Sequence, residues 1–266
     1  MIKTDKFQIA VVQGAFDGDV SSNLQKMKQR AVECKELYPQ ARLLLFPELA
    51  ANGYGLNPVV LQTAETMEGR IFSEMSRAAE ETQMYIAYGY VEKDGQARIY
   101  NSLMLINPRG EAAANYRKIH MTPYERSFFK PGDEFVIADT ELGRIGLMIC
   151  WDLAFPEAAR KLAAGGAELL LAPSAWEMPY DRPYRMFSMA RAIDNTVYLA
   201  ASNHTGCSGA FEFFGQSAIY APDGTALSAA KGNSEQILAA EIDYAWKRHL
   251  QESFFTMMNE RRTDLY

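Results

Sequence analysis

The sequence predicts a mixed α/β fold, in which helices cover sheets that contain both parallel and antiparallel strands. Short apolar runs of strand length alternate with segments whose apolar residues recur every three or four positions, as they do in helices. Residues 84–120 differ, because three apolar stretches follow one another with only turn signals between them. Strands that interleave with both helices and hairpins indicate a mixed sheet layered with helices.

The first half of the chain begins with a strand, a helix and a second strand. FQIAVVQ (7–13) has the length of a buried strand, and Asn23 is a candidate cap for the helix that follows. ARLLLFPEL (41–49) is a second strand, which Pro47 ends because proline has no amide to donate. The stretch 84–120 is expected to form an antiparallel meander. Four residues of the first helix are expected to face the core: Leu24, Met27, Ala31 and Cys34.

The second half repeats the pattern of strand, helix and strand. GRIGLMIC (143–150) and ELLLAPSA (168–175) are predicted strands, with a helix between them that starts near Pro156. Three later segments are predicted as a helix and two strands: 182–195, 197–203 and 215–225. The polar and aromatic C-terminus is expected to form an arm from about residue 244 to 266. No repeat or linker divides the chain, so we expect a single domain over residues 1–266.

The composition is that of an ordinary soluble globular protein, with 48% hydrophobic and 23% charged residues. The formal net charge is 27 − 33 = −6 without a block of like charges, so neither a nucleic-acid-binding face nor a basic membrane patch is expected. No apolar run approaches the roughly 18 residues of a transmembrane helix, and the N-terminus does not have the pattern of a signal peptide. Three widely spaced cysteines fit a reducing compartment. We therefore expect a cytoplasmic protein. The three histidines show no spacing typical of a metal site, so no bound metal is expected.

Three residues that could take part in catalysis follow apolar strands: Glu48, Lys118 and Cys150. In layered α/β proteins, sites assemble at the carboxyl ends of strands. Each residue alone has a structural explanation, because a cysteine can be a core residue, a glutamate can cap a turn, and a lysine can protect a strand edge. A strand-to-helix turn after Cys150 would place its sulfur beside free amides and a helix dipole, both of which favour a thiolate. None of the structural explanations accounts for all three residues together.

The segments that contain these residues resemble the nitrilase superfamily of carbon–nitrogen hydrolases. The similarity rests on three ordered blocks: FPELAANGYG (46–55), YRKIHMTPYE (116–125) and ICWDLAFPE (149–157). Flanking segments are also similar, at 11–15, 201–206 and 215–224. The resemblance implies a four-layer αββα sandwich, usually paired into a homodimer, although a larger oligomer stays open.

The resemblance also implies a role for each matching residue. Cys150 would be the nucleophile, Glu48 the general base and acid, and Lys118 with the backbone N–H of Trp151 would stabilise the oxyanion. Glu125 would hold Lys118 or orient the substrate amide. Amide hydrolysis needs a nucleophile, a proton shuttle and charge stabilisation, which these groups supply. No metal or organic cofactor is required.

The residues around Cys150 favour an amidase-like branch over true nitrilases, which tend to have Glu at the position of Asp152. Tyr54 and Trp176, with Glu177 nearby, are candidates for a pocket that suits an aliphatic amide bearing a distant amine. The substrate class stays open between such an amide, an N-carbamoyl amine and a nitrile. An acyl or amide transferase would use the same catalytic residues, and a catalytically silent interaction module is the remaining alternative.

Overall fold

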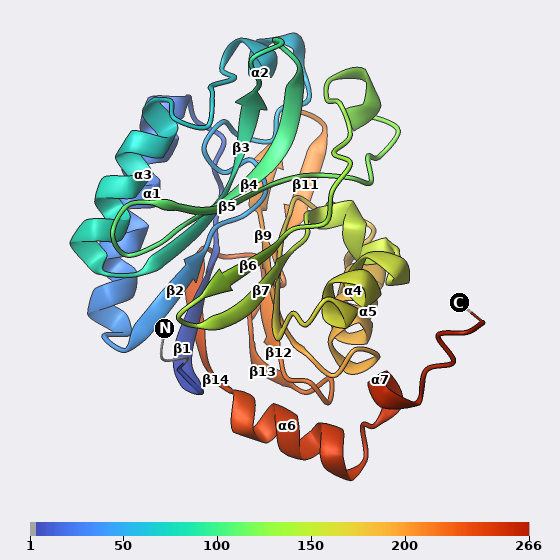
Figure 1. Cartoon of the computed structure of the whole chain (residues 1–266). Coiled ribbons are helices and arrows are strands. Elements are labelled where there is room, and N and C mark those ends of the chain that lie inside the picture. Colours follow the sequence, from blue (N-terminus) through green and yellow to red (C-terminus); the bar gives the residue numbers. More distant parts are fainter. Residues whose placement is uncertain (1–3, 266) are drawn as a thin grey trace.

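The chain folds into two facing sheets (Figure 1). The structure is a computed structural model and describes residues 4–265. The first sheet is built mainly from the N-terminal half of the chain. Its strand order is β14-β1-β2-β3-β4-β5. The β1–β2 and β2–β3 pairs are parallel, and the other pairs are antiparallel. The predicted meander is confirmed as β3, β4 and β5. The strand bounds are β1 (Lys6–Gln13), β2 (Ala41–Leu45), β3 (Tyr85–Lys93), β4 (Ile99–Ile106), β5 (Ala112–Arg117) and β14 (Gln236–Asp243).

The second sheet has the order β13-β12-β9-β8-β7-β6, with β7, β8 and β9 parallel to one another. A small hairpin of β10 and β11 lies beside it. The strand bounds are β6 (Ile137–Thr140), β7 (Gly143–Leu147), β8 (Leu169–Ser174), β9 (Tyr198–Asn203), β10 (Thr205–Ser208), β11 (Phe211–Phe214), β12 (Ala218–Tyr220) and β13 (Ala226–Ala229).

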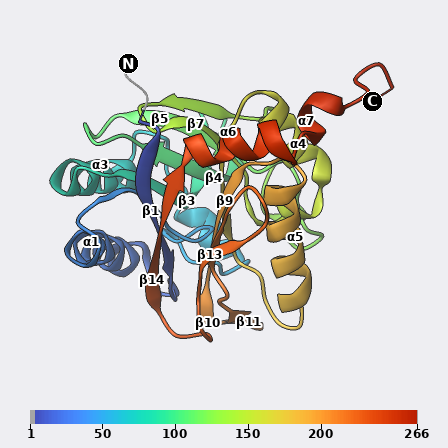
Figure 2. The same ribbon diagram turned by 90° about the horizontal axis from the view of Figure 1, so that it is seen from below.

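Helices cover the outer face of each sheet. Figure 2 shows the four layers edge-on, with α1 and α3 outside the first sheet and α5 outside the second, where α4 also lies. The αββα sandwich expected from the sequence is therefore confirmed. The helix bounds are α1 (Val20–Leu37), α2 (Pro58–Gln62), α3 (Arg70–Thr82), α4 (Pro156–Ala164), α5 (Asp181–Ile193), α6 (Tyr244–Ser253) and α7 (Met257–Glu260).

The start of α1 differs from the sequence prediction. The helix begins at Val20, and the Asp19 side chain caps it by accepting a hydrogen bond from the Ser22 N–H at 2.8 Å. Asn23 instead lies within the first turns, where its amide exchanges hydrogen bonds with the backbone of Gly18. The cap prediction was wrong because both residue types suit a helix N-terminus, and only the folded chain shows which one occupies the cap.

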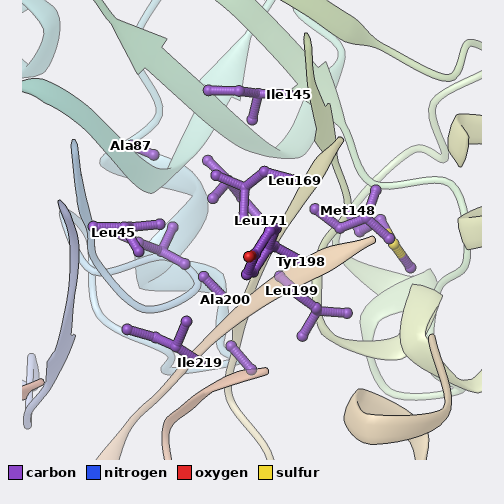
Figure 3. Packing of buried hydrophobic residues seen from close by; sticks show 14 of the residues in the cluster. Leu45, Ala87, Ile145, Met148, Leu169, Leu171, Tyr198, Leu199, Ala200 and Ile219 are labelled. Atoms are coloured by element: carbon purple, nitrogen blue, oxygen red, sulfur yellow. The ribbon is translucent and has the colours of Figure 1, made fainter. Parts of the chain in front are cut away.

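Apolar side chains from both sheets fill the space between them. Figure 3 shows Leu45 and Ala87 of the first sheet near Leu171 and Ala200 of the second, and all four are fully buried. Each large apolar side chain buried in this way contributes about 1.5–3 kcal/mol. This layer fixes the two sheets relative to each other, so that the carboxyl ends of β2, β5 and β7 come together. Within residues 4–265, no helix has the length and apolar character needed to span a membrane.

Candidate active site

The structure brings Glu48, Lys118, Glu125 and Cys150 together, although they lie far apart in the sequence. The Lys118 Nζ lies 2.7 Å from Glu48 Oε1 and 2.6 Å from Glu125 Oε1, and all three side chains are fully buried. Cys150 is buried and lines a cavity, and its side chain interacts with the Glu48 carboxyl so as to lower the pKa of that group. A nucleophile candidate, two carboxylates and an ammonium therefore share one site.

Glu48 sits in a tight turn after β2. Leu49, the next residue, has φ +49°, a left-handed conformation that is unusual for leucine. His204 directly follows β9, and its Nε2–H donates a hydrogen bond to the Glu48 carbonyl at 2.6 Å. Burial lowers the pKa of His204 to about 4, so this ring is neutral and acts as a fixed donor. The backbone of Glu48 is thus held from the second sheet.

Cys150 follows β7 in a strained turn. Its φ is +47°, and it opens a short 3₁₀ helix, η2 (Cys150–Ala154). The helix α4 begins only at Pro156. The sulfur was expected at the N-terminus of this helix, but the 3₁₀ helix η2 lies between them. The amides at the start of η2 include that of Trp151, and the first amides of a helix have no partner within it.

Asp152 ties the turn of Cys150 to the chain around Lys118. Its buried carboxylate accepts hydrogen bonds from the Ile149 N–H and the Tyr116 hydroxyl, each at 2.8 Å. It also accepts from the backbone N–H of His120 at 3.1 Å and from its ring Nδ1–H at 2.7 Å. One carboxylate therefore contacts residues on both sides of Lys118 as well as the residue before Cys150.

Lys118 lies opposite Asn101 across β4 and β5. The Lys118 N–H donates to the Asn101 carbonyl at 2.9 Å, and the two side chains point into the same buried site. The Asn101 Nδ2 donates to Glu48 Oε1 at 2.7 Å and to Glu125 Oε1 at 3.2 Å. The second oxygen of Glu125 accepts from the Thr122 N–H at 2.9 Å. Both oxygens of Glu125 are thus used within the protein, which favours a role in holding Lys118.

Burial and charge separate the protonation properties of these groups. Burial raises the pKa of Glu48 to about 7, despite the nearby Lys118 ammonium. Burial opposes ionisation of Glu125 too, but Lys118 and the Thr122 N–H outweigh it and lower the pKa of that carboxyl. Burial and the Glu48 carboxylate raise the pKa of the Cys150 thiol, whereas both carboxylates hold the pKa of Lys118 above its ordinary value. The resting site is thus a thiol beside a potential base and a permanent cation.

A cavity of about 480 Å³ opens onto Cys150. Its walls are mostly aromatic, and its lining includes the three pocket residues proposed from the sequence: Tyr54, Trp176 and Glu177. Trp151, proposed for its backbone N–H, also lines the cavity. The other aromatic lining residues are Tyr124, Tyr180, Phe187 and Phe211. Glu177 is the one charged side chain among the described lining residues. Burial raises the pKa of its carboxyl.

Sequence reasoning missed three buried residues that support the site: Asn101, Asp152 as an anchor, and His204. Asn101 lies in a strand with an otherwise apolar inner face, which is a recognisable signal because a buried amide needs partners. Asp152 and His204 belong to segments that were noted only for their resemblance. Their hydrogen bonds depend on contacts between separate strands and sheets, which the sequence does not display.

Comparisons with known proteins agree with this arrangement. The family model described as carbon–nitrogen hydrolase matches residues 8–248. A probable nitrilase of Schizosaccharomyces pombe is 38% identical over 98% of this chain and 97% of its own length. A carbon–nitrogen hydrolase structure from Helicobacter pylori is similar with a TM-score of 0.92 and 29% identity, over 98% of this chain and 97% of that one.

A second similar structure concerns the chemistry of the site. It is a mutant of an amidase from a Nesterenkonia species, with the acetamide moiety of fluoroacetamide added covalently to the active-site cysteine. It is 25% identical, with a TM-score of 0.87, over 100% of this chain and 97% of that one.

Proposed function

Because the chain belongs to the carbon–nitrogen hydrolase family, the nitrilase superfamily, we propose that it cleaves the C–N bond of a small amide through a thioester on Cys150. The observation that best supports this function is the buried Lys118, which contacts Glu48 and Glu125 beside a cysteine that lines a cavity. Hydrolysis of an amide needs a nucleophile, a proton shuttle and a fixed positive charge, and this site has one group for each.

In the first half of the reaction, Glu48 takes the thiol proton while the sulfur bonds to the amide carbon. The charge that develops on the amide oxygen is stabilised by the Lys118 ammonium and the Trp151 N–H. Protonated Glu48 then gives its proton to the nitrogen, the C–N bond breaks, and ammonia or an amine leaves. A pKa of about 7 for Glu48 suits both steps, since a group near the working pH can accept and return a proton.

In the second half, water replaces the amine. Glu48 takes a proton from the water while the water oxygen bonds to the thioester carbon. The Lys118 ammonium and the Trp151 N–H stabilise the second oxyanion as they did the first. The C–S bond then breaks, the sulfur regains a proton from Glu48, and the acid leaves.

The cavity walls support a substrate with an apolar body and a positive charge. Among residues 4–265, no lysine or arginine lies within ion-pair distance of Glu177, so its carboxylate is available to a ligand. Aromatic faces such as those of Tyr54 and Trp176 also attract cations. An aliphatic amide with a distant amine therefore fits better than an amide with a second carboxylate. An N-carbamoyl amine with a cationic tail has the same features.

Ammonia release from a panel of small amides, N-carbamoyl amines and nitriles tests the reaction. We expect the wild type to release ammonia from amides, and Cys150→Ala to reduce the rate to background. Hydroxylamine added as an acceptor separates hydrolysis from acyl transfer, because a transferase would form hydroxamate in preference to acid. Equal rates for the wild type and Cys150→Ala on every compound would contradict the hydrolase, and faster cleavage of nitriles than amides would favour a nitrilase.

A matched pair of amides tests the role of Glu177. The two amides have equal chain length and end in either an ammonium or a methyl group. Glu177→Gln is expected to lower kcat/KM for the cationic amide by about tenfold, because it removes a modest ion pair that contributes about 1.4 kcal/mol. The kcat/KM for the neutral amide should not change. An equal loss for both amides would mean that Glu177 shapes the cavity without recognising charge.

A further inference from the structure

Asn101 and Lys118 contact the same oxygen of Glu48. Their distances to Oε1 are both 2.7 Å, from the Asn101 Nδ2 and the Lys118 Nζ. The other oxygen, Oε2, is buried and has no hydrogen-bond partner among residues 4–265. The two oxygens of this carboxylate are therefore not equivalent: one is held by two donors, and the other is free to accept a proton.

The Asn101 side chain suits this position chemically. Its Nδ2 has two hydrogens, and it faces two carboxylate oxygens, Oε1 of Glu48 and Oε1 of Glu125. The opposite amide orientation would place a carbonyl oxygen against both carboxylates, so the charges determine the orientation. Asn101 is also fixed through its backbone, which accepts a hydrogen bond from the Lys118 N–H across the two strands. Asn101 thus holds Glu48, Glu125 and Lys118 in one rigid group.

We propose that Asn101 is a positioning residue that locks Oε1 of Glu48 and thereby makes Oε2 the oxygen that takes the proton of Cys150. The inference rests on the proposed role of Glu48 as base. Asn101 does not contact the reacting atoms of a substrate; it acts through the orientation and the charge of Glu48. A hydrogen bond to a carboxylate also favours its ionised form, so Asn101 makes Glu48 a base at lower pH than it would otherwise be.

Asn101→Ala tests this role through the pH dependence of Cys150 reactivity. The probe is iodoacetamide, with the modified Cys150 peptide quantified by mass spectrometry, so the readout needs no substrate. In the wild type, the alkylation rate is expected to rise with pH as Glu48 ionises. Loss of the Asn101 donor removes a hydrogen bond to a charged group, and the midpoint should move upward by about one pH unit. At a pH below both midpoints, the rate should fall about tenfold.

Ser102→Ala is the matched control. Ser102 is the next residue in β4, and its hydroxyl donates to Glu92 at 2.6 Å on the other face of the sheet. The Ser102→Ala substitution removes a buried hydrogen bond of the same strand but no contact with Glu48, so the midpoint pH of alkylation should stay at the wild-type value. A purely structural role of Asn101 would give the two variants the same midpoint.

Asn101→Asp serves where the alanine variant unfolds, because it keeps the shape of the side chain. The new carboxyl would face the carboxylates of Glu48 and Glu125 and oppose their ionisation. The midpoint pH of alkylation should therefore move upward by more than it does in Asn101→Ala. A wild-type midpoint in a folded Asn101 variant would overturn the proposal. An active wild type is not required: if no amide were cleaved while the midpoint moved as expected, the proposed function would fail and the positioning role would stand.

Discussion

At the scale of single residues, the site gives two similar glutamates different protonation properties. Glu48 and Glu125 both contact the Lys118 Nζ, at 2.7 and 2.6 Å. Burial raises the pKa of Glu48 to about 7, whereas Lys118 and the Thr122 N–H lower the pKa of Glu125. Two carboxyl groups whose environments push their pKa values apart can divide the work of a proton shuttle and a permanent anion.

This division predicts the sign of a change in the pH profile. In the wild type, kcat/KM should fall below about pH 7, because protonated Glu48 cannot accept the thiol proton. The negative charge of Glu125 raises the pKa of Glu48. Glu125→Gln removes this charge and should lower the pKa of Glu48, so the fall of kcat/KM on the acid side of the pH profile should move to lower pH. The absolute rate should drop at least tenfold, because Lys118 loses an anchor. Measurement of kcat/KM from pH 5 to 9 checks both effects, and an upward move of the acid limb would contradict the assignment.

At the scale of elements, the turn after β2 depends on the strand beside it. A Cβ at Gly89 in β3 would lie 2.1 Å from the Leu49 nitrogen and 2.8 Å from the Glu48 carbonyl carbon. These are backbone atoms, which cannot rotate away as a side chain would. Glycine at position 89 therefore lets the turn that holds Glu48 lie directly on the sheet.

Gly89→Ala should displace this turn. We expect a loss of stability of about 1–3 kcal/mol from overpacking, and at least a hundredfold loss of kcat/KM because Glu48 moves away from Cys150. Gly95→Ala is the control, since a Cβ there would meet nothing within 4 Å. It should change stability by less than about 0.5 kcal/mol. Thermal unfolding and ammonia release measure the two effects, and near wild-type activity for Gly89→Ala would show that the turn can relax.

The elements also show how far the sequence can predict this molecule. The apolar runs and turn signals predicted the strands that precede Glu48, Lys118 and Cys150, because local patterns reflect local structure. The start of α1 was predicted at Asn23, although Asp19 is the cap, because side-chain type alone does not select between two suitable residues. Asn101 was missed because its partners depend on strand register and on contacts between distant turns. The 3₁₀ helix after Cys150 was also unforeseen, since Asp152 stabilises it through residues outside the segment.

At the scale of the whole molecule, the outer layer of the second sheet leaves apolar side chains exposed. Met186 and Met189 lie three positions apart on α5 and are 52% and 43% exposed. Figure 2 shows α5 as the outermost layer on its side, with α6 running toward it along the end of the sandwich. Exposed apolar side chains that gather on one side often mark an interface.

We propose that α5 pairs with its counterpart in a homodimer, the assembly that the family resemblance implies. In sedimentation or light-scattering measurements, the wild type should have about twice the chain mass of 29.9 kDa. Met186→Glu combined with Met189→Glu should shift the protein toward the monomer, because a two-fold axis would place each new carboxylate twice in the same buried interface. Val59→Glu is the control, since Val59 is 63% exposed on α2, away from α5 in Figure 1.

A monomeric wild type at micromolar concentration, or equal dissociation of both variants, would rule out this interface. If the monomeric variant kept full kcat/KM, each cavity would be complete within one chain, as the lining of Cys150 by residues of the same chain predicts.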